Sequence, residues 1–264
     1  MAVGFVDIHC HLLSGIDDGA DDPNESLAMA RMAVADGIET IICTPHQLGN
    51  YRANTAEIIR KRVGQLQRLL RESKVPLRVL PGADVRIEAD MIEQLQQDHV
   101  LTLGDQRRHV LLELPHELYL PLESIIVSLN DLGMQSILSH PERNQGILRQ
   151  PSLLKPLVKA GCLMQVTAGS LAGTFGPMIQ RFAQSIVSQG LCHFIATDAH
   201  GPTARRPRIR GAYQIAADLV GPTTADMMCI RNPSLVARGE TVPGGVLGVN
   251  KRGIRGWLGL RRAS

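Results

Sequence analysis

Aromatic side chains are scarce in this sequence, since Phe, Trp and Tyr make up only 3% of its 264 residues. Single-stranded nucleic acids bind largely by stacking their bases on such rings, so a nucleic-acid ligand is disfavoured. The core must be built instead from Leu, Ile, Val, Ala and Met, within a hydrophobic content of 44%. A chain of this length and composition suits one large α/β domain or two small ones.

The sequence also lacks a disulfide framework, a membrane-length apolar run and a basic N-terminal region followed by an apolar stretch. Its five cysteines are odd in number and widely spaced, and most lie within apolar runs, so we expect buried, reduced thiols. These features predict a cytoplasmic protein. No cysteine has an arginine six positions later, which excludes the thiolate mechanism of cysteine-dependent phosphatases.

Two further patterns are missing. Neither GxGxxG nor GxxxxGK[ST] follows the first predicted strand, so nucleotide binding loses support. Lysines number only five, and they fall on predicted helices, at a helix end or near the C-terminus. The two-metal amidohydrolase barrel commonly needs a lysine at a strand end and is therefore disfavoured, although its one-metal version stays open.

Acidic residues are absent after Glu240, whereas five bases follow it. Without those five charges the net charge changes from +3 to −2, so the basic character belongs to the C-terminus and not to a nucleic-acid surface. We expect residues 1–242 to form a catalytic barrel and residues 243–264 a flexible basic tail. Trp257, Leu258 and Leu260 lie among its arginines, and the tail is either solvated or touches a partner or an anionic membrane.

Short apolar runs alternate with helical patterns about seven times. The predicted strands are 2–6, 40–43, 77–80, 110–112, 135–138, 163–166 and 193–196. The predicted helices are 22–36, 55–72, 90–97, 122–132, 152–160 and 177–189. Such alternation predicts a parallel sheet covered by helices, either as a closed barrel or as an open doubly wound sheet.

Histidines and carboxylates occur at the ends of these strands or in the loops that follow. The candidate metal ligands are His9, His11, Asp18, His46, Asp84, Glu113, His140, Asp198 and His200. An open sheet would concentrate polar groups at one switch point, whereas a ring brings all strand ends to one mouth. The pattern therefore favours a TIM-like barrel with its site at the C-terminal ends of the strands.

The first strand ends in Asp7-Ile-His9-Cys-His11. Because side chains alternate along a strand, His9 and His11 should face the same way and Cys10 the opposite way. Asp7 is predicted to share the histidine face and to orient one imidazole by accepting its second ring N–H.

Nine nitrogen and oxygen ligands without a thiolate are too many for one tetrahedral ion, so we expect two or three ions. Mixed imidazole and carboxylate ligands suit Mn, Fe or Zn. A hydroxide bridging such ions would be a nucleophile at neutral pH, and hydrolysis of a phosphate ester is the natural chemistry. Arg143, Arg205 and Arg206 are candidates for binding the phosphate, because a guanidinium suits bidentate phosphate contacts.

The motifs together resemble the polymerase-and-histidinol-phosphatase (PHP) superfamily, over about residues 3 to 210. They are most similar to the bacterial metal-dependent protein-tyrosine phosphatases of capsular and exopolysaccharide clusters. The motifs that carry the resemblance are Asp7-Ile-His-Cys-His11, Asp17-Asp-Gly19, Thr44-Pro-His46, Glu113-Leu-Pro115, Ser139-His-Pro-Glu-Arg-Asn144 and Thr197-Asp-Ala-His200.

The resemblance implies a distorted (β/α)7 barrel with a trinuclear centre, usually of manganese. One ion would be held by His9, His11, Asp84 and Asp198, the second by Asp84, Glu113 and His140, and the third by Asp18, His46 and His200. Arg143 and an arginine after His200 would bind phosphate, and spacing favours Arg205 over Arg206. The family usually has Glu where this chain has Asp84, one methylene shorter.

The resemblance also implies a substrate, a phosphotyrosine on a bacterial tyrosine autokinase of capsule or exopolysaccharide synthesis. A small phosphoester such as histidinol phosphate, or a metal-binding scaffold without activity, are the alternatives. A protein substrate needs an open mouth and a free metabolite an enclosing lid. The loops 47–54 and 168–176 are expected to decide between them.

Overall fold

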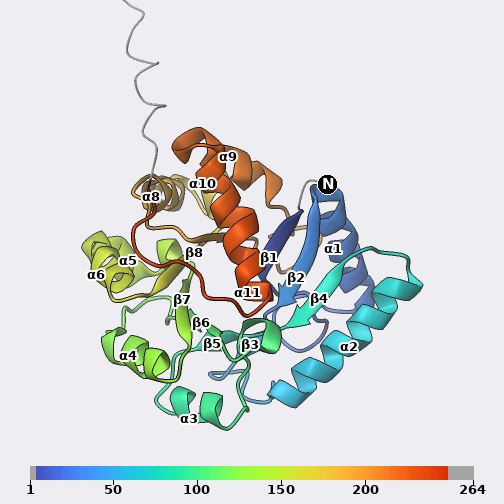
Figure 1. Cartoon of the computed structure of the whole chain (residues 1–264). Coiled ribbons are helices and arrows are strands. Elements are labelled where there is room, and N and C mark those ends of the chain that lie inside the picture. Colours follow the sequence, from blue (N-terminus) through green and yellow to red (C-terminus); the bar gives the residue numbers. More distant parts are fainter. Residues whose placement is uncertain (1–3, 249–264) are drawn as a thin grey trace, which may run out of the picture.

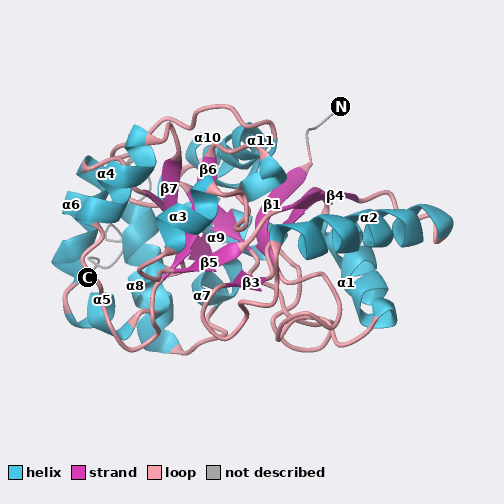
Figure 2. Ribbon diagram, turned by 90° about the horizontal axis from the view of Figure 1, so that it is seen from below, coloured by secondary structure: helices cyan, strands magenta, loops and turns pink. Residues whose placement is uncertain are grey.

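The computed structural model describes residues 4–248, with the strands at the centre and helices around them (Figures 1 and 2). The strands are β1 Phe5–Cys10, β2 Ile38–Cys43, β3 His46–Gln47, β4 Arg78–Pro81, β5 Asp84–Arg86, β6 His109–Glu113, β7 Gln135–Ser139, β8 Leu163–Thr167 and β9 Phe194–Ala196. The helices are α1 Pro23–Asp36, α2 Ala56–Glu72, α3 Met91–Gln96, α4 Glu123–Asp131, α5 Gln145–Arg149, α6 Leu154–Lys159, α7 Ala168–Ala172, α8 Pro177–Ser188, α9 Arg210–Val220, α10 Pro222–Asp226 and α11 Asn232–Ala237.

The strands form two parallel sheets, in the orders β1-β2-β4 and β3-β5-β6-β7-β8-β9. Only two residues separate β2 from β3, and two separate β4 from β5. The chain therefore passes directly from the first sheet into the second at both places, and each pair acts as one interrupted strand. The segment after β9 then returns to β1, where Asp198 N donates to His9 O (2.7 Å) and His11 N to Ala199 O (2.9 Å). These bonds connect the two sheets at their other edge, and the predicted parallel α/β fold with its succession of seven strands is confirmed.

Capping residues at both ends of α1 fix its boundaries as predicted. Asp22 accepts hydrogen bonds from the N–H groups of Asn24 and Glu25, and Pro23 occupies the first turn of α1. Gly37, with φ 97°, closes that helix in the left-handed conformation that glycine adopts without strain. The first strand differs from the prediction, because it continues to Cys10 and so contains most of the histidine motif.

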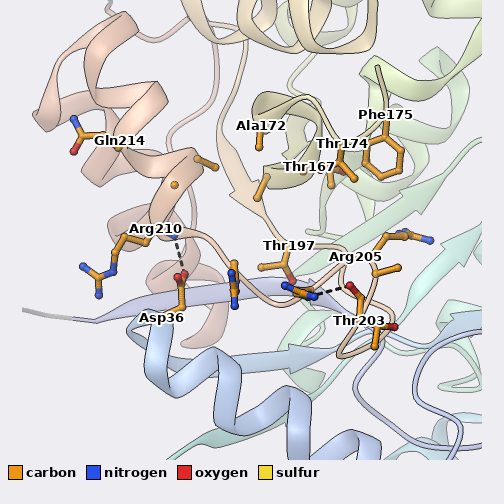
Figure 3. Close-up of a pocket in the computed structure, with 17 residues that line it drawn as sticks. Asp36, Thr167, Ala172, Thr174, Phe175, Thr197, Thr203, Arg205, Arg210 and Gln214 are labelled. Atoms are coloured by element: carbon orange, nitrogen blue, oxygen red, sulfur yellow. Dashed lines mark hydrogen bonds between the residues drawn. The ribbon is translucent and has the colours of Figure 1, made fainter. Parts of the chain in front are cut away.

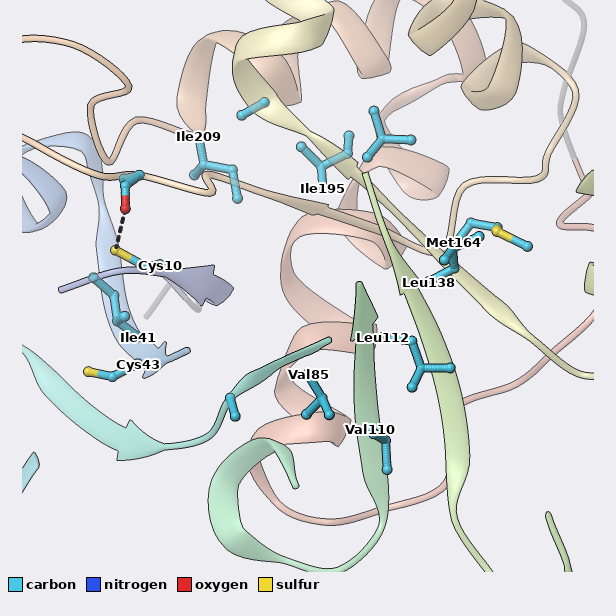
Figure 4. Close-up of a cluster of buried hydrophobic side chains, with 14 of the residues drawn as sticks. Cys10, Ile41, Cys43, Val85, Val110, Leu112, Leu138, Met164, Ile195 and Ile209 are labelled. Carbon is cyan, nitrogen blue, oxygen red and sulfur yellow. Dashed lines mark hydrogen bonds between the residues drawn. The ribbon is translucent and has the colours of Figure 1, made fainter. Parts of the chain in front are cut away.

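Apolar side chains alternate between two faces of the sheets. An inner cluster takes one residue from each of several strands, including Ile8, Ile42, Leu111, Ile137, Leu163 and Phe194. Their neighbours in sequence, among them Val110, Leu112, Leu138, Met164 and Ile195, pack on the outer face under the helices (Figure 4). Because successive side chains on a strand point to opposite faces, strands such as β2, β6, β7 and β8 contribute to both clusters.

Helix α11 covers the end of the strand ring opposite the histidine motif. Its residues Val236 and Ala237, together with Val242, pack against Val6 and Ile8 in the inner cluster. Figure 1 shows α11 lying across the strands, next to β1. The predicted elements included no helix after residue 189, so α9, α10 and α11 are additions that complete the core.

The predicted tail begins with residues that still contact the folded body. His193 Nε2 lies 2.9 Å from Gly245 O, and Leu247 N donates to Gly190 O (2.8 Å). Trp257 and the other tail residues after 248 lie outside the described residues, so the domain boundary and the role of the tail stay predictions. Within residues 4–248, none of the helices combines the length and apolar character that a membrane crossing needs.

Candidate metal centre

A bulge in β1 turns the histidine motif into the mouth of the ring. Asp7 pairs with Ile41 and Cys10 with Cys43, so β1 advances three residues while β2 advances two. Ile8 therefore packs in the inner apolar cluster, while His9 lies next to it at the polar mouth. Cys10 packs on the outer face, as predicted.

Asp7 is a correction to the sequence analysis. Its carboxylate accepts hydrogen bonds from the backbone N–H of Thr197 (3.0 Å) and from the Thr197 hydroxyl, and it orients no imidazole ring. The bulge is the physical reason, because an extra residue between Asp7 and the histidines breaks the alternation that would have put them on one face. Asp7 instead fastens β1 to the segment after β9.

Two other residues orient the first pair of histidines. His9 Nδ1 lies 2.9 Å from Gln165 Oε1, and His11 Nδ1 lies 2.7 Å from Asp17 Oδ2. Each partner accepts a hydrogen bond from Nδ1–H, which leaves the lone pair of Nε2 free in both rings. Burial lowers the pKa of His9 to about 3 and that of His11 to about 4, so both rings are neutral near pH 7.

The two free Nε2 atoms face each other at 3.2 Å, and Asp198 Oδ1 lies 3.2 Å from the first and 3.6 Å from the second. Lone pairs and a carboxylate at such distances repel one another unless a cation lies among them. Metal–ligand bonds of about 2.0–2.2 Å separate neighbouring ligand atoms by about 3–3.5 Å. The residues present therefore fit a divalent metal ion.

Asp84 supports the same conclusion. Both of its carboxylate oxygens are buried without a hydrogen-bond partner among the described residues. Burial and the nearby charge of Glu113 raise its pKa well above the usual range. Asp84 Oδ2 lies 3.5 Å from His9 Nε2 and 3.6 Å from His46 Nδ1. A buried carboxylate without donors is costly, and metal coordination removes that cost.

The loop after β1 contributes Asp18, the most exposed of the carboxylates described so far in this centre. Asp18, whose side chain is 53% exposed, lies 3.3 Å from His46 Nε2 and 3.5 Å from His200 Nε2. Hydrogen bonds to these imidazoles lower the pKa of Asp18 well below its usual range. Gly19 makes the loop possible, because a Cβ there would lie 2.3 Å from His11 O.

The nine predicted side chains thus converge at one mouth, and we call them the histidine–carboxylate cluster. Their ligand atoms form four overlapping groups: His11, Asp18, His46 and His200; His9, His11 and Asp84; His9, His140 and Asp198; and His46, Asp84 and Glu113. The first group contains the predicted set for the third ion. His140 groups with Asp198, and its Nε2 is 4.0 Å from Asp84, so the division among ions stays a prediction.

Two arginines reach the cluster from different loops. Arg205 donates to Asp198 Oδ2 at 2.6 Å, and Arg143 forms an ion pair with the same oxygen at 2.7 Å. Burial by itself raises the pKa of Asp198. The opposing effect of His9 and the two guanidinium groups is larger, so the pKa lies well below the usual range. The Nε atoms of both arginines are buried without partners among the described residues. Arg206 instead bonds to Thr203 O, away from the cluster.

Three residues of this site have backbones in the left-handed region: His140 (φ 32°), Asp198 (φ 50°) and Arg205 (φ 47°). Such conformations cost about 1–2 kcal/mol each for residues other than glycine. Strain of this kind persists where the surrounding structure enforces it, and it is typical of functional sites.

The sequence analysis gave no role to several residues beside the cluster. Gln165 lies in the middle of β8 and Asp17 precedes a predicted ligand, but neither has a local signal that predicts its imidazole partner. Tyr51 stacks on His46 with ring centroids 5.2 Å apart, and Phe175 lies 4.9 Å from the Arg143 guanidinium. These rings come from the two loops that were expected to shape the mouth.

We expect Asp17→Asn to lower metal affinity by about 10- to 100-fold, the range typical of residues that orient a metal-binding imidazole. Asp17 Oδ2 accepts from His11 Nδ1 and from His46 N (3.1 Å), and an amide would offer one poorer acceptor. Titration of the metal-free protein with Mn²⁺, read by calorimetry, measures the change. Asp21→Asn, on an exposed residue of the same loop, is the control; equal affinity of the two variants would contradict a role for Asp17.

Comparison with known proteins links this site to one group. The chain matches a family model described as capsular polysaccharide synthesis, CpsB/CapC, over residues 5–238. Tyrosine-protein phosphatase YwqE of Bacillus subtilis (strain 168) is 37% identical over 240 residues, which cover 90% of this chain and 93% of that protein. The putative tyrosine-protein phosphatase CapC of Staphylococcus aureus is 32% identical over 202 residues, covering 76% and 79%.

Comparison with solved structures gives the same family. One from a study of YwqE of Bacillus subtilis and CpsB of Streptococcus pneumoniae, described as metal-dependent tyrosine phosphatases, has a TM-score of 0.88. It is 36% identical and covers 94% of this chain and 100% of its own. The phosphotriesterase homology protein of Escherichia coli has a TM-score of 0.56 at 11% identity, covering 89% and 98%, and shares the fold alone.

Proposed function

The chain belongs to the CpsB/CapC family of capsular polysaccharide synthesis, and on that premise we propose that it is a metal-dependent protein-tyrosine phosphatase. The observation that carries the proposal is the convergence of Arg143 and Arg205 on the histidine–carboxylate cluster. Cation ligands and phosphate-binding groups then lie in one mouth, as hydrolysis of a phosphate monoester requires.

We assign the nine residues of the cluster as ligands to two or three divalent cations, with Mn²⁺ favoured and Fe or Zn as alternatives. Bound there, the cations supply an activated water as nucleophile and offset charge on the phosphoryl group. The neutral His9 and His11 rings suit cation binding because no proton has to leave them near pH 7.

Arg143 and Arg205 would hold the phosphate. Each guanidinium places one terminal nitrogen against Asp198 and keeps N–H groups, including a buried Nε–H, for phosphate oxygens. Their shared carboxylate fixes both planes before substrate arrives, which lowers the ordering cost of binding. Arg206 is the weaker candidate, because it points to the Thr203 carbonyl.

An extended substrate suits the surroundings of the cluster. A cavity of about 360 Å³, lined by Asp18, Tyr51, Arg86 and Glu113 among others, adjoins it on one side. Tyr51, stacked on His46, and Phe175, beside Arg143, would supply aromatic surface for the phenyl ring of a phosphotyrosine. We propose a phosphotyrosine protein as substrate, specifically a bacterial tyrosine autokinase. The five free, buried cysteines support a cytoplasmic location.

One experiment tests the function. Metal content is measured by mass spectrometry on the same sample that is assayed, with Mn²⁺, against a phosphotyrosine peptide and histidinol phosphate. Two or three ions with peptide turnover, abolished by a chelator and restored by Mn²⁺, are expected. Turnover of histidinol phosphate alone would move the substrate to a small phosphoester, whereas turnover unaffected by the chelator would exclude the metal mechanism.

We expect Asp84→Glu to retain or raise the metal content. Asp84 reaches His9 and His46, but His140 Nε2 remains 4.0 Å away, and a longer side chain would extend further into the cluster. Metal per chain after dialysis measures the effect, with Asp84→Asn as the matched variant that removes the charge and should lose metal. Loss of metal from Asp84→Glu would show that the site is built around the shorter side chain.

A further inference from the structure

A large groove adjoins the arginine side of the cluster. Its volume is about 850 Å³, within the range of ligand pockets, and it lies between helix α7 with the loop after it and the segment that leads into α9. Figure 3 shows Phe175 and Arg205 on one side of this view and Arg210 and Gln214 on the other. Because Arg205 lines the groove and also contacts Asp198, the groove borders the cluster.

The charge of this groove is strongly positive. Its lining contains four arginines, Arg205, Arg206, Arg208 and Arg210, and a single carboxylate, that of Asp36. Asp36 Oδ2 accepts the backbone N–H groups of Ile209 (2.6 Å) and Arg210 (2.8 Å), so its charge serves to cap α9. We call this feature the arginine groove.

Three of its guanidinium groups have no carboxylate partner among the described residues, although Arg206 Nε donates to Thr203 O and the Arg210 guanidinium lies 5.6 Å from the centroid of the Phe5 ring. Arg206, Arg208 and Arg210 are exposed, and within residues 4–248 none has a carboxylate oxygen within 4.0 Å. Some exposed arginines of the described chain have such partners, as Arg52 does with Glu88 and Asp90 and Arg238 with Glu240, whereas others, such as Arg68 and Arg71 on α2, have none. The groove differs in bringing three arginines without a described carboxylate partner together at alternate positions of one segment beside the site.

The walls of the groove suit a polypeptide. Phe175, Ala172 and Ala212 provide apolar surface, while Thr174 and Gln214 provide hydroxyl and amide groups at its edges. Apolar walls with a few polar groups are usual for sites that bind an extended chain. Positive charge along such walls selects carboxylate side chains and steers their approach.

Building on the proposed function, we propose that the arginine groove binds an acidic segment of the substrate protein that flanks the phosphotyrosine. The occupant is a stretch of chain bearing glutamate or aspartate, whose carboxylates pair with Arg208 and Arg210. Its phosphotyrosine then reaches Arg205 and Arg143 at the end of the groove. The groove contributes binding and selectivity, and it leaves the reacting atoms to the cluster.

The test compares two phosphotyrosine peptides, one flanked by glutamates and one by glutamines. The double variant Arg208→Gln/Arg210→Gln is assayed beside wild type and beside Arg68→Gln/Arg71→Gln, which removes two exposed arginines of α2. Loss of two exposed charge contacts should raise KM for the glutamate peptide about three- to twentyfold. The kcat should be unchanged, as should turnover of p-nitrophenyl phosphate, and the control should keep the wild-type preference.

Other results would overturn the proposal. It fails if wild type shows no preference for the glutamate peptide, or if the preference survives in the groove variant. If wild type hydrolyses neither peptide, the proposed function fails, and the groove is then tested by binding alone. Fluorescence anisotropy of a glutamate peptide carrying a phosphonate in place of the phosphate gives that binding; equal affinity of wild type and the groove variant would contradict the proposal.

Discussion

Replacement of Asp198 by alanine is expected to reduce both the metal content and the turnover of a phosphotyrosine peptide by at least about a hundredfold, beyond the usual effect of an outer-sphere residue. Asp198 contacts both the histidines and the arginines of the site: Oδ1 lies 3.2 Å from His9 Nε2, and Oδ2 pairs with Arg143 and Arg205. Without this carboxylate, two partly buried guanidinium groups would lose their shared partner and the cluster would lose a proposed ligand. Mass spectrometry and a phosphate-release assay measure the two losses.

Asp198→Asn separates charge from shape, since it keeps the size of the side chain and removes its charge. Its metal content should fall almost as far as that of the alanine variant. Asp218→Asn, on the exposed face of α9, is the matched control and should behave as wild type. Full metal content and turnover in Asp198→Ala would mean that Asp198 is neither a metal ligand nor a necessary partner of the two arginines.

Replacement of Arg143 by alanine is expected to lower kcat/KM by about 10²- to 10³-fold, as is usual when a preorganised donor to developing charge is removed. The metal content should be unchanged, because Arg143 contacts Asp198 through the oxygen that faces away from His9. Phe175 holds the guanidinium from its other side at 4.9 Å. Assays with a phosphotyrosine peptide, paired with metal analysis of the same samples, measure both quantities.

Arg143→Lys refines this prediction. A lysine keeps the charge but loses the planar pair of donors, so its activity should lie between those of wild type and Arg143→Ala. Arg149→Ala, on an exposed arginine of α5, controls for general effects of removing a nearby charge. Loss of metal in Arg143→Ala would show that this arginine supports the cluster and not the phosphate.

The proposed ligands could be predicted from sequence because each lies at a strand end or in the loop that follows, and strand ends can be read from local patterns. His46 follows the run Ile41-Ile42-Cys43, and His140 follows Ile137-Leu138. A parallel ring places all such ends at one mouth, so separate local signals predict one common site. The residues that orient these ligands carry no comparable signal, since Gln165 is 156 positions from the histidine it contacts.

The sequence by itself determined the alternation of strands and helices, the helix boundaries at Asp22 and Gly37 and the common face of His9 and His11. These features depend on backbone periods and on capping groups a few residues apart, so neighbouring residues suffice to set them. Only the tertiary structure decided the bulge in β1, the partner of Asp7, the closure by α11 and the convergence of Arg143 with Arg205. Each of these depends on the register of another strand or on a contact between distant segments, and such contacts exist only once the ring has formed.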